Sequence, residues 1–148
     1  MQQLKWLLLI TGGALLLGFG SCYGLIRLAS ASRSCDRFNI DNIEVHALVN
    51  IPSVQSVTCH YNPDKQIKSN RFVLRTTDFD MNDFISRNGF KAISAPDATW
   101  AGVLAAATPS LQLPASGEFY ANSGQRDTKR WYFLLDKSSA TLWCALQY

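Results

Sequence analysis

Residues 6–26, WLLLITGGALLLGFGSCYGLI, form a long apolar stretch without a charged side chain between Lys5 and Arg27. A helix needs about 20 apolar residues to cross a bilayer core about 30 Å thick. All of its backbone hydrogen bonds are then internal, so its glycines are tolerated in lipid. The stretch shows no polar face, which a soluble helix of this length would need. We therefore predict a single transmembrane helix over residues 6–26, with residues 1–5 as an N-terminal flank.

Two other interpretations of this stretch stay open. Gly20 and Ser21 precede Cys22 as small residues precede the lipidated cysteine of a lipoprotein, although the apolar run continues beyond Cys22. The second is a cleavable signal peptide, cut near residues 29–31. In a retained helix, Gly20 and Gly24 lie one turn apart, a spacing that lets two membrane helices approach closely. Self-association through this helix is therefore a further hypothesis.

The orientation of the anchor rests on opposing observations. Arg27, Arg33 and Arg37 follow the apolar stretch, which favours a cytoplasmic C-terminal domain under the positive-inside rule. A short N-terminus joined directly to an apolar run is instead typical of an anchor that exports the domain on its C-terminal side. Cysteines available for a disulfide also favour an oxidising compartment. We predict an extracytoplasmic domain at a bacterial cell envelope.

The rest of the chain has room for one domain. Residues 27–42 are polar and rich in Ser and Arg, which predicts a juxtamembrane linker, and residues 43–148 are long enough for a modest core. The net charge of the chain is +3, and Lys5 and Arg27 belong to the anchor flanks. The remainder is nearly neutral and has no run of basic residues, so we expect no nucleic-acid partner.

Apolar and polar residues alternate in several short segments, which predicts half-buried strands. These segments are residues 43–49, 54–61, 71–76, 118–122, 130–136 and 141–148. The last two are apolar on both faces, which predicts a central hairpin that is covered on at least one side. The sequence SGQRDT, residues 123–128, is predicted to be a turn.

The helix prediction rests on Met81, Phe84 and Ile85, which recur at helical spacing within residues 79–88. Thr77 or Asp78 is the predicted N-cap, and Asn88-Gly89 is a typical helix stop. Residues 96–108 are a weaker candidate for a second helix. We predict an α+β fold, a small antiparallel sheet packed against one or two helices, with residues 79–88 over the terminal hairpin.

Candidate chemistry is sparse. Cys59 and Cys144 lie on the apolar sides of their predicted strands, so we predict a disulfide between them, with Cys35 as the alternative partner of either. Cys59 and His60 are neighbours on a strand and point to opposite faces, which argues against a catalytic pair. The aspartates lack the spacing of a calcium loop. We expect no metal and no cofactor.

Aromatic residues offer the one candidate binding surface. If Tyr120, Tyr132 and Trp143 share an outer sheet face, they form a patch suited to a protein partner. The alternative is that they belong to the core or lie under residues 96–108. We predict a non-enzymatic, membrane-anchored protein-binding or accessory domain. The other hypotheses are a small envelope enzyme using cysteine or carboxylate chemistry, and a cytoplasm-facing subunit assembled through the glycine-bearing helix.

Overall fold

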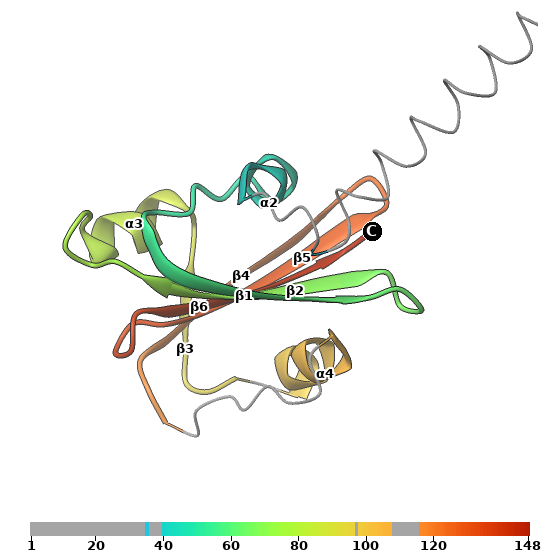
Figure 1. The fold of residues 1–148 in the computed structure, drawn as a ribbon. Coiled ribbons are helices and arrows are strands. Elements are labelled where there is room, and N and C mark those ends of the chain that lie inside the picture. The colour runs from blue at the N-terminus through green and yellow to red at the C-terminus, as the bar shows by residue number, and fades with distance from the viewer. Residues whose placement is uncertain (1–34, 36–39, 97, 108–115) are drawn as a thin grey trace, which may run out of the picture.

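The computed structural model describes Cys35 and residues 40–96, 98–107 and 116–148 (Figure 1). None of the helices within these residues is long and apolar enough to cross a membrane. The predicted transmembrane segment, residues 6–26, lies outside the described residues together with Gly20, Cys22 and Gly24. The predictions of an anchor, of lipidation and of helix packing therefore stay predictions.

The domain is built on one six-stranded antiparallel sheet with the strand order β1-β2-β6-β5-β4-β3. The strands are β1 (Val54–Asn62), β2 (Ile67–Leu74), β3 (Lys91–Ile93), β4 (Phe119–Arg126), β5 (Lys129–Asp136) and β6 (Thr141–Gln147). The hairpin of β5 and β6 is central, as its apolar character on both faces predicts. The α+β class is confirmed.

Helices cover both faces of the sheet (Figure 1). Helices α2 (Ile40–Ala47) and α3 (Met81–Arg87) lie on one face, and α4 (Ala98–Ala107) lies on the other. Successive side chains of β5 point to opposite faces of the sheet and belong to two cores. Phe133 and Leu135 pack under α2 and α3, whereas Leu134 packs with Leu104 of α4. The helix predicted over the terminal hairpin is confirmed, and the structure adds a covered second face.

Residues 43–49 are not the predicted strand, because α2 takes them up to Ala47. Ile43 and Ala47 are one helical turn apart and both are buried, whereas Val45, which a strand would bury beside them, is 64% exposed. Leu48 then adopts a positive φ of 55° and ends the helix. The apolar spacing fitted a period of two by coincidence.

Helix α3 confirms the prediction with a different cap. The side chain of Asp80, not Thr77 or Asp78, accepts a hydrogen bond from the Asp83 backbone N–H at 2.8 Å. Gly89 ends the helix with a φ of 64°, the left-handed conformation that glycine adopts without a steric penalty. Phe90 follows and is buried against Phe133, with ring centroids 6.1 Å apart.

The β4–β5 hairpin is longer than the sequence predicts. Strand β4 continues to Arg126, so only residues 127 and 128 remain as the turn, and four of the six residues of SGQRDT are in the strand. Gly124 lies opposite Trp131, whose indole ring covers it. The Trp131 Nε1–H donates to the Asn122 Oδ1 at 3.0 Å and fixes the ring in that position.

The Gly124→Ala variant is expected to lower the free energy of unfolding by about 1–3 kcal/mol. An added Cβ would clash with the Trp131 ring, so the indole would have to leave Gly124 and Asn122. Gly102→Ala is the matched control, because nothing lies within 4 Å of its added Cβ on helix α4. It should raise stability by up to about 1 kcal/mol. Urea unfolding measures both, and equal effects would contradict this account of Gly124.

Candidate functional site

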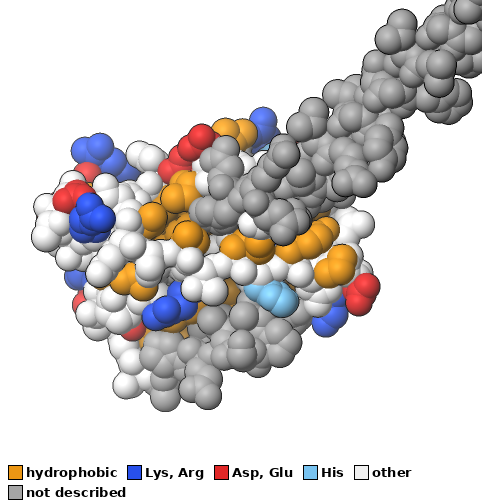
Figure 2. All heavy atoms as spheres, in the orientation of Figure 1, with side chains coloured by type: hydrophobic (Ala, Val, Ile, Leu, Met, Phe, Trp, Pro, Cys, Tyr) orange, Lys and Arg blue, Asp and Glu red, His pale blue; other side chains and the backbone are white. Residues whose placement is uncertain are grey.

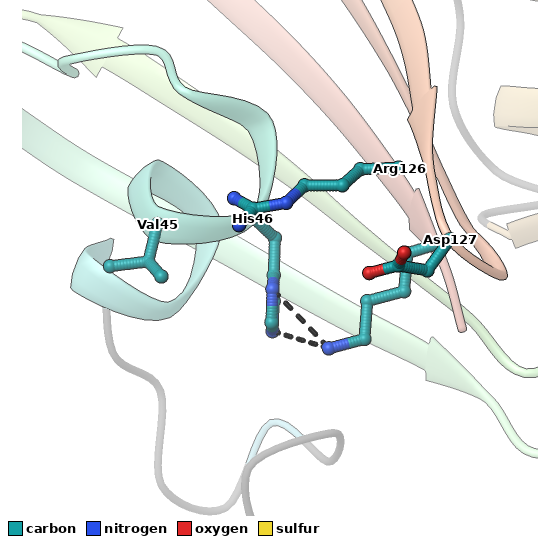
Figure 3. Close-up of a pocket in the computed structure, with 5 residues that line it drawn as sticks. Val45, His46, Arg126 and Asp127 are labelled. Atoms are coloured by element: carbon teal, nitrogen blue, oxygen red, sulfur yellow. Dashed lines mark hydrogen bonds between the residues drawn. The ribbon is translucent and has the colours of Figure 1, made fainter.

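A pocket of about 220 Å³ lies between α2 and the β4–β5 hairpin. Its lining residues are Val45, His46, Arg126, Asp127 and Lys129 (Figure 3). The hairpin brings Arg126 and Lys129 directly opposite each other, since they are the last register pair before the turn. Helix α2 then places His46 against this pair. Segments more than 80 positions apart in the chain thus build one site.

His46 and Lys129 are joined across the pocket. The Lys129 Nζ lies 3.0 Å from the His46 Nε2 and 3.3 Å from the Nδ1. Burial of the ring, followed by the nearby charges of Lys129 and Arg126, lowers the pKa of His46. The imidazole is therefore neutral at neutral pH and accepts a hydrogen bond from the ammonium group. The Tyr148 ring meets the imidazole edge-on, with centroids 6.2 Å apart.

The pocket carries an excess of positive charge. Arg126 and Lys129 converge on it, and in Figure 3 the Arg126 side chain extends toward His46. Among the residues that the structure describes, Asp127 is the single acidic residue of its lining. Within the described part of the chain, neither Arg126 nor Lys129 takes part in an ion pair. The arrangement suits a small anion, because the two cations that line the pocket would both attract a negative charge placed in it.

The favoured cysteine pairing is wrong, and the alternative with Cys35 as the partner of Cys59 is confirmed. The structure joins Cys35 to Cys59, with 5.8 Å between the Cα atoms, and leaves Cys144 free and buried. The predicted Cys59–Cys144 disulfide is wrong because Asn70 of β2 lies directly between the two residues. They share a face but are two strands apart, about 10 Å, whereas disulfides rarely join Cα atoms more than about 7 Å apart.

Cys144 belongs to a buried polar row under the α2 face. Lys68 and Asn70 of β2 are 0% and 3% exposed, and Cys144 is fully buried. Burial raises the pKa of the Cys144 thiol, and the nearby Lys68 charge opposes this only in part. Burial also lowers the pKa of Lys68. A protonated thiol that solvent does not reach is unsuited to nucleophilic chemistry.

The three aromatic residues of the predicted patch do not come together. Tyr120 packs with the core under α2 and α3, whereas Tyr132 and Trp143 lie on the α4 face. Trp143 is only 4% exposed, beside Leu104 of α4. The alternative holds for Trp143, which is buried, whereas Tyr120 and Tyr132 are half-buried against the two cores. The sequence alternation placed each residue on a strand face but could not relate the faces of different strands.

The two edges of the sheet differ. Strand β3 forms one edge with three residues, and β1 forms the other with nine, VQSVTCHYN, none of them Lys, Arg, Asp or Glu. Residues 55–58 of β1 and His60 are exposed. A register irregularity between Val54 and Ser56 disturbs only the start of the strand. Beyond it, no strand among the described residues pairs with this uncharged edge.

Sequence reasoning missed both the pocket and the exposed edge. The one sequence feature that could have indicated the pocket is the cluster of basic residues around the hairpin turn, QRDTKR. Comparison of the chain with models of protein families, with curated proteins and with solved structures finds no match.

Proposed function

We propose that this chain is a single-pass, membrane-anchored bacterial protein whose domain lies outside the cytoplasm and binds a partner protein without catalysing a reaction. The partner contributes an extended segment that pairs with the outer edge of β1. The observation that carries the proposal is that edge: nine residues long, without a charged side chain, and largely exposed.

Two features support the anchored, extracytoplasmic part of the proposal. The uncharged stretch of residues 6–26 has the length of a membrane-spanning helix. The Cys35–Cys59 disulfide fits an oxidising compartment, since cytoplasmic thiols are kept reduced. In that setting the disulfide ties the start of the domain to its edge strand.

The outer edge of β1 is suited to pairing with another strand. An outer strand presents unpaired N–H and C=O groups, and soluble proteins usually blunt such an edge with charges, proline or a very short strand. Strand β3 follows that rule, and β1 does not. An added strand would satisfy the free backbone groups, while alternate side chains give specificity. Its side chains would meet Val57 on one face and Thr58 and His60 on the other, which favours a segment of alternating apolar and polar residues.

The side of the membrane is tested by reporter fusions after Tyr148. Alkaline phosphatase is active only outside the cytoplasm, and a fluorescent protein serves as the cytoplasmic reporter. We expect an active phosphatase. Fluorescence with an inactive phosphatase would place the domain in the cytoplasm and overturn this part of the proposal.

Partner binding is tested by photo-crosslinking in cells that express the full chain. A photoreactive residue at Thr58 should give a discrete adduct with another protein, and the same residue at the exposed Lys91 of β3 should not. Val57→Lys, which adds a charge to the edge, should strongly reduce the Thr58 adduct. An adduct of twice the chain's own mass would replace the partner with a second copy. No adduct, or equal adducts from both edges, would overturn the proposal.

A further inference from the structure

Helix α2 exposes two large apolar side chains beside the cationic pocket. Val45 is 64% exposed and Leu48 is 71% exposed. Val45 lies in the last turn of the helix and also lines the pocket, and Leu48 directly follows the helix end. Figure 2 shows hydrophobic side chains reaching the surface next to charged ones in the region of α2. Apolar contact area and cationic groups thus lie together.

Within the described residues, no carboxylate forms an ion pair with Arg126 or Lys129. Helix α2 has two acidic residues, Asp41 and Glu44, and the Glu44 Oε1 accepts a hydrogen bond from the Ile51 backbone N–H at 2.6 Å. On the hairpin, the described lining residues are one acidic residue, Asp127, and two basic residues, Arg126 and Lys129. The Tyr148 ring lies 5.9 Å from the Lys129 Nζ. A site of this kind gains from an external anion.

The pocket lies at the end of the sheet where the chain leads back toward residues 6–26. Register pairs connect Asn62 to Ile67, Ile67 to Gln147, and Gln147 to Arg130, so one end of the sheet holds the β1–β2 turn and the β4–β5 hairpin. Cys59, near that end of β1, is bonded to Cys35. The segment from Ile26 to Cys35 spans at most about 30 Å when fully extended. Cys59 lies three residues from the Asn62 end of β1 and five from the Val54 end, so the tether joins the domain nearer to the pocket end.

From these observations we infer that the pocket end of the domain docks on the bilayer and binds the phosphate of an anionic phospholipid headgroup between Arg126 and Lys129. Val45 and Leu48 contact the interfacial region beside it. The inference rests on the proposed membrane anchoring. A free phosphate offers the same chemistry, but the exposed apolar pair and the short tether favour the headgroup. In this orientation β1 stands upright on the membrane, and its edge faces sideways to a partner.

The test uses the full chain in lipid nanodiscs, either neutral phosphatidylcholine or a mixture with phosphatidylglycerol. The chain has two histidines, so the ring NMR signals of His46 and His60 are readily assigned. A phosphate between Arg126 and Lys129 should raise the pKa of His46 by about one pH unit in the anionic discs, because it offsets the cations that lower this pKa. The His60 signals serve as the reference for the general surface potential.

Paired substitutions make the result specific. In Arg126→Gln/Lys129→Gln the difference between the two lipids should vanish, whereas Lys91→Gln on β3 should retain it. A change shared equally by His60, or kept in the double variant, reports only the surface potential and overturns the inference. The same rise with millimolar inorganic phosphate in neutral discs assigns a free anion instead. A chain that stays outside the discs contradicts the anchoring, and an inserted chain with an unresponsive His46 contradicts the docking alone.

Discussion

Replacing Cys35 by serine is expected to lower the free energy of unfolding by about 3–4 kcal/mol. The disulfide joins residues separated by 24 positions, and in the loop-entropy model it stabilises the domain by restricting the unfolded chain. It also ties Cys35, before α2, to an edge strand whose single neighbour among the described strands is β2. Urea unfolding of the full chain, with and without reductant, measures the effect.

The cysteines provide the controls. Cys59→Ser and the Cys35→Ser/Cys59→Ser double variant should match Cys35→Ser, because each removes the same bond. Reductant should destabilise the wild-type domain and leave these variants unchanged. Cys144 should resist thiol reagents in the native state, since it is fully buried. A loss below about 1 kcal/mol in Cys35→Ser, or additive losses in the double variant, would contradict the assigned pairing.

The second large effect is expected for Phe133→Ala, which should cost about 3–5 kcal/mol. Phe133 is 0% exposed at the middle of β5, where its ring meets Phe90, and Cys144 is its neighbour on β6. Truncation leaves a cavity that the central strands cannot close, because helices hold both faces of the sheet. Thermal and urea unfolding measure the loss.

Val57→Ala is the comparison for that variant. Val57 is also apolar and lies in a strand, but it is 39% exposed on the edge, so its truncation should change stability by no more than about 0.5 kcal/mol. Similar losses for Phe133→Ala and Val57→Ala would show that the central strands do not carry the core as the structure describes.

Local patterns along the chain were enough to predict several elements, because their physical causes are local. Alternation located β1, β5 and β6, and the Asn88-Gly89 stop located the end of α3. The same alternation failed at residues 43–49, where both a strand and a helix bury Ile43 and Ala47. Only the exposure of Val45, which depends on the rest of the fold, separates the two.

The arrangement of the elements could not be predicted in this way. The sequence placed Cys59 and Cys144 on apolar strand faces, and they do share a face, but β2 lies between them. Alternation also leaves the register between strands undetermined. That register puts Tyr120 on one face of the sheet and Tyr132 and Trp143 on the other. The pocket joins His46 to a hairpin far along the chain, and no local period encodes such a contact.

The place of β6 has a consequence for how the domain is made. This strand is the last of the described elements along the chain, yet it lies between β2 and β5 and joins the two halves of the sheet. Until it emerges from the ribosome, β1–β2 and β3–β4–β5 lack the strand that connects them, and small isolated ribbons are marginally stable. The sheet can therefore form as one unit only after β6 has been made.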